Sequence, residues 1–142
     1  MSRKGTETID HAAQVAHEWV NELQARLEWA DPADVLRLMR VTLAALRDRL
    51  GPEESAQLAA QLPLMIRGLF WEGWNPSGKP VLDRSGADFI AQIERHVGEV
   101  AEYRGPEDIT TVFRTLEAHV SEGEIADVRA RLPQALRALW PQ

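Results

Sequence analysis

The chain has 142 residues, 44% of them hydrophobic, which is enough for one compact domain with an apolar core and argues against disorder over most of its length. Its formal net charge of −6 at pH 7 argues against nucleic-acid binding, because proteins that bind nucleic acids usually present a basic face to the phosphates. The absence of cysteine excludes disulfides, thiolate nucleophiles and cysteine-ligated metal sites.

The N-terminal residues are polar and lead directly into the first predicted helix. No apolar stretch is long enough for a signal peptide or a membrane span, so we expect a cytoplasmic protein with no membrane partner. Apolar residues then recur at helical spacing, which predicts a helix whose apolar stripe faces the core. The stripe consists of Ile9, Ala12, Ala13, Ala16, Trp19, Val20, Leu23 and Leu27.

A second helix is predicted between Asp31 and Gly51. Asp31 suits the N-cap and Pro32 the first helical position, whereas Gly51 suits the residue that follows a helix. The apolar residues of this segment again recur with a period near 3.6, so we expect a second helix that faces the core.

A third helix is predicted from Pro52. The interior Leu62-Pro63 should break it, because proline lacks the amide donor and crowds the preceding turn. The short segment after the break, residues 64–71, is expected to anchor itself in the core through its apolar side chains. These are Met65, Ile66, Leu69 and Phe70.

Residues 72–82 are predicted to connect two halves of the chain. Gly73 is expected to end the preceding helix, and the Asn-Pro and Ser-Gly pairs after it to form turns. A connector needs no tryptophan, yet Trp74 lies within it. Trp74 either pins the connector onto the junction between the halves or, with Lys79 beside it, forms the exposed anchor of a binding site for a partner protein.

Three further helices are predicted in the second half of the chain. The first starts with a capping motif at Ser85, and the second runs from Pro106 to Val120. The third begins with a capping box at residues 121–124 and breaks at Leu132-Pro133. The first of them carries an apolar stripe of Phe89, Ile90, Ile93, Val97 and Ala101.

The chain also resembles itself. An offset of 74 residues aligns residues 29–40 with residues 103–114, and an offset of 70 residues pairs Glu54 with Glu124. The two offsets differ by four residues, about one helical turn, so the second copy corresponds to the first with one turn removed. This pattern predicts an all-α fold of six helices, or eight if the two breaks are counted, that arose by duplication of a three-helix unit.

The predicted repeats are residues 9–71 and 83–140. Each copy is too short to be very stable alone, so we expect the two to pack around a pseudo-two-fold axis. The predicted domain organisation is therefore a single helical domain over residues 1–142.

The two-copy plan combines with three specific segments, residues 62–80, 88–93 and 123–140. In combination they resemble the bacterial family catalogued as domain of unknown function 2267, over nearly the whole chain from about Ile9 to Trp140. The resemblance implies a small, soluble, helical bacterial protein. It brings no catalytic residue that could be assigned to a position in this sequence.

No motif indicates catalysis or metal binding. His11 and His17 are six residues apart and so lie on different sides of a helix, and His96 has no second histidine at ligand spacing. No serine lies in a Gly-x-Ser-x-Gly motif, and the residues around Lys79 lack the order of a phosphate-binding loop. We therefore predict no catalytic residue, no metal site and no cofactor, and we favour a protein that is not an enzyme.

Arg67 and Arg137 occupy matching positions in the two copies. They either make equivalent helix-end interactions and ion pairs within each half, or line two related grooves that accept an anionic ligand or an acidic partner segment. Together with Trp74 and Lys79, they are the candidate binding residues.

Two functional hypotheses follow. The first is a non-catalytic protein-interaction module, linked to bacterial stress physiology, that binds a partner protein or forms a homodimer. The second is a small-molecule-binding or enzymatic protein with a pocket between the two halves. An exposed apolar patch containing Trp71, Trp74 or Trp140 would favour the first, and a closed polar cavity with convergent ionisable groups the second. Neither hypothesis includes nucleic acid as a partner.

Overall fold

The structure, a computed structural model, describes residues 5–77 and 86–141. These residues form eight helices and no strand, which confirms the all-α prediction. None of the eight is long and apolar enough to cross a membrane. The helices are α1 (Glu7–Leu27), α2 (Pro32–Leu50), α3 (Pro52–Ala60), α4 (Leu64–Trp71), α5 (Gly86–Val97), α6 (Pro106–His119), α7 (Glu122–Arg131) and α8 (Gln134–Arg137).

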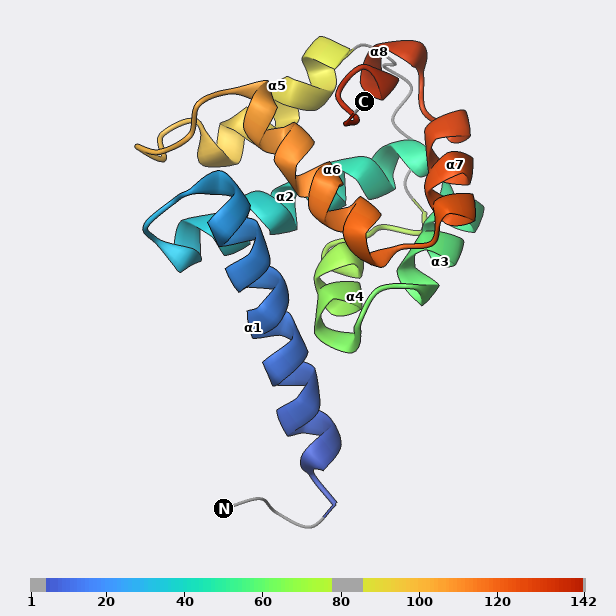
Figure 1. The fold of residues 1–142 in the computed structure, drawn as a ribbon. Helices are drawn as coiled ribbons and strands as arrows, with labels where there is room; N and C mark the ends of the chain where they lie inside the picture. Colours follow the sequence, from blue (N-terminus) through green and yellow to red (C-terminus); the bar gives the residue numbers. More distant parts are fainter. Residues whose placement is uncertain (1–4, 78–85, 142) are drawn as a thin grey trace.

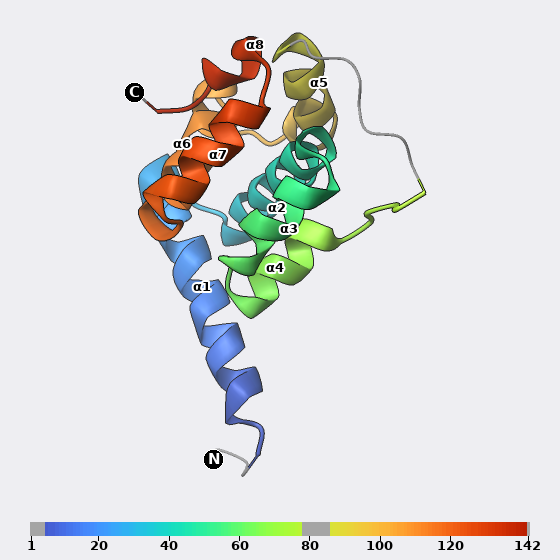
Figure 2. The same ribbon diagram turned by 90° about the vertical axis from the view of Figure 1, so that its right-hand side faces the viewer.

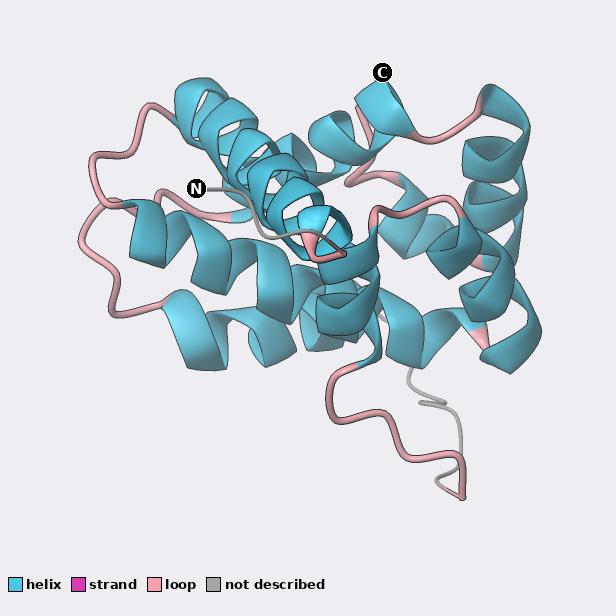
Figure 3. Ribbon diagram, turned by 90° about the horizontal axis from the view of Figure 1, so that it is seen from below, coloured by secondary structure: helices cyan, strands magenta, loops and turns pink. Residues whose placement is uncertain are grey.

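Helices from the two halves of the chain pack against each other (Figure 1). Helix α1 lies against α6, α2 against α5, and α3 against α7, so each of these pairs joins the first half (α1–α4) to the second (α5–α8). Helix α4 lies beside α1, α2 and α3, which all belong to the first half. The N-terminal turns of α1 project beyond the rest of the molecule (Figures 1 and 2). Figure 3 shows the described elements from that end, as helices joined by loops.

The hydrophobic core is shared by the two halves. Leu43 of α2, Ile93 of α5 and Ile109 of α6 are all fully buried. Near the C-terminus Trp140 stacks on Phe113 of α6, with ring centroids 4.4 Å apart. Because the same core draws side chains from both halves, the burial of apolar surface couples them into one folding unit.

Most helix ends lie where local sequence signals predicted them. The Asp31 carboxylate accepts a hydrogen bond from the Ala33 amide at 2.8 Å, as an N-cap should, and Pro32 is the first residue of α2. Gly51 follows α2 with a φ of 82°, a conformation that favours glycine. The Ser121 hydroxyl accepts from the Glu124 amide at 3.2 Å, which caps α7.

The two predicted breaks are also present. Helix α3 ends at Ala60 and α4 begins directly after Pro63, and α7 and α8 are separated in the same way at Pro133. Gly73, with a φ of 76°, lies just beyond the end of α4 as predicted. The rest of the predicted connector after Ser77, including Lys79, and the capping residue Ser85 lie outside the described residues.

Three expectations about the apolar stripes were wrong. Ile9 is 67% exposed, because α1 extends beyond the helices on which it packs. Met65 is 47% exposed, since it points away from the core side of α4 that Ile66 and Phe70 occupy. Ala101 is exposed and lies outside α5, which ends at Val97 before Gly98.

Candidate functional site

Arg67 and Arg137 bind the ends of the preceding helices. Arg67 donates from Nε to the Ala59 carbonyl at 3.0 Å and from Nη2 to the Leu62 carbonyl at 2.9 Å. Arg137 donates from Nε to the Leu132 carbonyl at 3.0 Å and from Nη2 to the Ala130 carbonyl at 3.4 Å. Both guanidinium groups therefore donate to carbonyls at or just beyond the ends of α3 and α7, where the breaks at Pro63 and Pro133 interrupt the helical hydrogen-bond pattern. A role for either in ligand binding stays a prediction.

The outer side of α4 is apolar and unusually flat. Leu64, Gly68 and Trp71 follow one another at i, i+4 and i+7, which places them in one row on the helix. Leu64 is 56% exposed and Trp71 is half-buried. A Cβ atom at Gly68 would meet no neighbour within 4 Å outside its own helix, so the packing of this fold does not require glycine there. Glycine inside a helix costs about 1 kcal/mol relative to alanine.

Trp74 extends this apolar row beyond the end of α4. Its ring centroid lies 5.0 Å from that of Trp71, which in turn meets the buried Phe70 edge-on at 5.2 Å. Trp74 is 40% exposed, so it both contacts the first half and presents part of its ring to solvent. Of the three tryptophans considered above for an exposed patch, Trp140 is instead buried in the core.

We define the α4 face as Leu64, Met65, Gly68, Trp71 and Trp74. Helix α1 lies along one side of α4, and the sequence there is acidic. Residues 5–25 contain four acidic side chains and no lysine or arginine. Glu7, Asp10 and Glu18 are exposed. The α4 face is thus an apolar surface beside an acidic helix.

Helix α8, which corresponds to α4 in the second half, has different residues on the side that faces away from the core. Gln134, Ala135 and Ala138 stand 70 residues after Leu64, Met65 and Gly68, and all three are exposed. No large apolar side chain is exposed on α8. The apolar face is therefore a property of α4 and is not shared by its counterpart.

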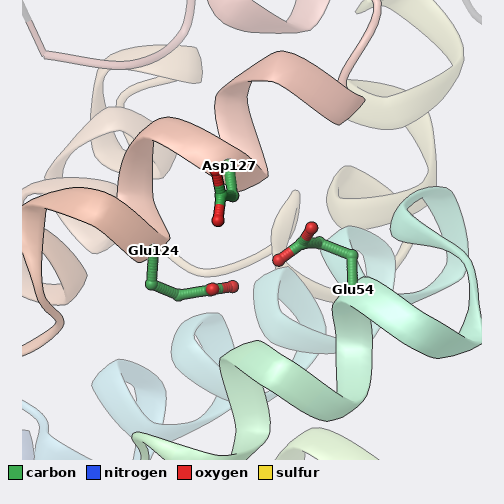
Figure 4. A group of neighbouring side chains, drawn as sticks. All are labelled: Glu54, Glu124 and Asp127. Atoms are coloured by element: carbon green, nitrogen blue, oxygen red, sulfur yellow. The ribbon is translucent and has the colours of Figure 1, made fainter.

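A second group of side chains gathers where α3 meets α7. Glu54 of α3 and Glu124 and Asp127 of α7 each place a carboxylate oxygen within 4.8 Å of the others (Figure 4). Glu54 is 3% exposed and Glu124 is 7% exposed, whereas Asp127 is exposed. We call these three residues the carboxylate triad. It joins the first half of the chain to the second.

The environment of the triad disfavours full ionisation. Burial raises the pKa of Glu124 to about 8, and the hydrogen bond and charge of Glu54, together with the charge of Asp127, act in the same direction. The Nε atom of Arg131 lies 3.7 Å from one Glu54 oxygen, but the Arg131 side chain is largely exposed and offsets little of the negative charge. At neutral pH the isolated site is therefore expected to hold a proton on Glu124.

The offset of 70 residues pairs Glu54 with Glu124, but the sequence does not indicate that the two side chains meet. The same offset also set Leu64 against Gln134, a difference that marks the α4 face. Exposure, however, required the fold.

The open pocket between α6 and α7 lies within the second half. It has a volume of about 380 Å³ and is lined by Glu117, Val120, Glu122, Ile125, Ala126 and Arg129. Its position differs from the pocket between the halves that the second hypothesis requires.

A comparison with protein families finds one match that covers most of the chain. The model of a family described as "Uncharacterized conserved protein (DUF2267)" matches residues 16–139. No curated protein shows significant similarity to the chain.

Proposed function

Since the chain belongs to the DUF2267 family of uncharacterised conserved proteins, we propose a function from its surface: it is a non-catalytic module whose α4 face binds a basic amphipathic helix of a partner protein. The observation that carries this proposal is the open Gly68 in the middle of an exposed apolar row. Glycine at this position weakens the helix and fills no tight space. It does let the backbone of another helix approach closely.

The side chains around Gly68 suit such a partner. Leu64 and Trp71 lie one turn or less to either side of it and supply apolar contact area, and Trp74 widens the surface at one end. Apolar and aromatic anchors at helical spacing are the usual way in which a protein groove or face receives an amphipathic helix.

The negative charge of α1 favours a basic partner helix. The α1 helix beside α4 exposes Glu7, Asp10 and Glu18, and residues 5–25 have no basic residue to balance them. A helix with lysines or arginines flanking its apolar stripe complements this arrangement, whereas a second acidic copy of the chain is repelled by it. This consideration favours a partner protein over the predicted homodimer.

Binding to a defined probe tests the proposal. We would titrate the protein with a fluorescently labelled synthetic helix of leucine and lysine, and with its leucine and glutamate counterpart, and follow the anisotropy. The lysine peptide should bind the wild type more tightly than the glutamate peptide. The double variant Leu64→Gln/Met65→Ala, which gives α4 the outward residues of α8, should weaken binding at least tenfold.

Gln134→Ala on α8 is the matched control and should leave the affinity unchanged. Equal binding of both peptides to wild type and double variant, or no binding at all, would contradict the proposal. Sedimentation velocity tests whether the α4 face forms a homodimer. If the wild type is a dimer and Leu64→Gln/Met65→Ala is a monomer, a second copy of the chain binds the α4 face and the proposed basic partner is wrong.

The finer hypotheses stay predictions. A link to bacterial stress physiology and a cytoplasmic location would be tested by localising a tagged chain, and its binding partner, in a bacterial host before and during stress. The alternative of a small-molecule-binding or enzymatic site between the halves also stays a prediction. At that junction, the carboxylate triad suits a small cation better than an organic molecule, because two of its three members are buried.

A further inference from the structure

The carboxylate triad contains buried oxygens with no hydrogen-bond partner. Glu54 Oε2 and Glu124 Oε2 are each inaccessible to solvent and accept no hydrogen bond from any described residue. Both side chains are more than nine-tenths buried and point toward each other and toward Asp127 (Figure 4). An ionised, buried carboxylate oxygen without a hydrogen-bond partner is costly because it has lost its hydration, and the contact between Glu54 and Glu124 relieves this cost only while one of the two is protonated.

The surrounding protein does little to offset this cost. Glu54 and Glu124 both lie in the first turn of their helices, where the helix dipole favours negative charge by up to about 2 kcal/mol at buried positions, which is less than the cost of burying a carboxylate. Arg131 reaches only the other Glu54 oxygen, Oε1, at 3.7 Å. The triad thus has three negative charges when ionised and one distant, exposed positive charge.

We propose that Glu54, Glu124 and Asp127 bind a hard divalent cation, Ca²⁺ in preference to Mg²⁺, which links α3 to α7. All three ligands are carboxylates, and oxygen ligands without nitrogen or sulfur select hard cations. The unpartnered oxygens of Glu54 and Glu124 then become ligands. Asp127 lies at the exposed side of the triad, so the ion reaches the site from solvent.

The irregular arrangement of the ligands, two on α7 and one on α3, favours the larger ion. They all lie within 4.8 Å of one another, so a single ion can contact all three. Mg²⁺ demands a near-ideal octahedron and gives up its waters reluctantly, whereas Ca²⁺ accepts an irregular set of oxygen ligands such as these three carboxylates. Water completes the coordination on the Asp127 side.

The ion would link the two halves of the chain. Its ligands come from α3, through Glu54, and from α7, through Glu124 and Asp127, so binding holds these two helices together.

Isothermal titration calorimetry with CaCl₂ and MgCl₂ at constant ionic strength tests the proposal. Wild-type protein should bind one Ca²⁺ ion, more tightly than Mg²⁺. Glu124→Gln should weaken Ca²⁺ binding at least tenfold. Glu122→Gln removes the same charge from the same helical turn outside the triad, and should leave the affinity within a factor of two.

Thermal unfolding provides a second readout, because an ion that binds only the folded state raises its Tm. Ca²⁺ should raise the Tm of wild type and of Glu122→Gln, but not that of Glu124→Gln. If wild type binds no Ca²⁺ at millimolar concentrations, or if Glu124→Gln responds like wild type, the triad is a carboxyl pair that shares a proton and the proposal is wrong.

Discussion

Helices α4 and α8 are the last helices of the two halves of the chain. Their residues that face the core are similar, and their residues that face away from the core are different. Each follows a Leu-Pro break, carries an arginine that binds the end of the preceding helix, and leads to a buried aromatic residue, Phe70 or Trp140. Outward, α4 presents Leu64 and Met65, where α8 has Gln134 and Ala135. The inward positions meet the same packing requirement in both halves, whereas the outward positions are free to differ.

The pair α3 and α7 shows the opposite relation. Here a matched residue, glutamate, lies at the junction, so that Glu54 and Glu124 meet each other. Matched residues at the junction of the two halves bring like charges into contact, whereas matched residues away from the junction stay in separate halves. The comparison of the halves therefore identifies two places of interest, one where they differ on the surface and one where they agree at the junction.

The largest expected effect tests whether the buried aromatic residues Phe70 and Trp140 contribute equally to stability. Phe70→Ala and Trp140→Ala should each lower the free energy of unfolding by roughly 3–5 kcal/mol, because both remove a large, fully buried side chain. Urea denaturation measures it. Trp74→Ala, at a partly exposed position, is the control and should cost much less. If one of the two substitutions hardly changes the free energy of unfolding, the two halves do not depend equally on their buried aromatic residue.

The two arginines provide the next test. Arg67→Gln and Arg137→Gln should each destabilise the fold by about 1.5–3 kcal/mol, because each removes charge-assisted hydrogen bonds to helix-end carbonyls. Thermal unfolding of both variants beside Arg114→Gln, an exposed arginine on α6, measures the difference. Intact stability with loss of ligand binding would instead support the groove interpretation.

The junction predicts an unusual dependence on pH. Because the pKa of Glu124 is raised to about 8 in the folded state, folding favours its protonated form. Its contribution to stability is complete below the unfolded pKa near 4.5 and is lost as the pH rises through about 8. Without divalent cations, wild type should lose roughly 1–2 kcal/mol between pH 6 and pH 9 relative to Glu124→Gln.

Chemical denaturation at several pH values, in the presence of a chelator, measures this difference. Glu122→Gln should follow the wild-type curve, since Glu122 lies outside the triad. Parallel curves for wild type and Glu124→Gln would show that the Glu54–Glu124 contact does not hold a proton.

The smallest expected effect concerns Gly68. Gly68→Ala should stabilise the protein by about 0.5–1 kcal/mol, because alanine favours the helix and its Cβ meets open space. The same variant should weaken binding of the basic helix, because it holds the partner's backbone away. Urea denaturation and anisotropy measure the two effects on one sample. A loss of stability would show that the fold itself requires glycine there.

Much of the fold was predictable because its signals are local. Asp31 with Pro32, Gly51, and Ser121 mark helix ends through hydrogen bonds and backbone angles within one turn, and the prolines break helices by their own chemistry. The capping box predicted at α7 is only half present. The Ser121 hydroxyl caps the helix, but the Ser121 amide donates to the side chain of Gln61, the residue after α3, and not to Glu124.

The candidate sites were harder to predict, because their properties depend on what lies opposite. The helical stripe that includes Ile9 is the same whether or not a neighbour covers it, and only the length of α1 relative to the body leaves Ile9 in solvent. Met65 is similar: hydrophobicity indicates burial in general, but the α4 backbone decides which side faces the core. The predicted internal duplication stays a prediction.

The sequence by itself therefore determined the all-α class, the helix boundaries and the breaks, since these follow from interactions between residues a few positions apart. Only the tertiary structure decided that Leu64 and Gly68 form an open face and that Glu54 meets Glu124 and Asp127 in a buried junction. The exposure of a side chain and the pKa of a carboxylate depend on which residues from distant parts of the chain lie around it. A pattern of residues a few positions apart does not contain that information.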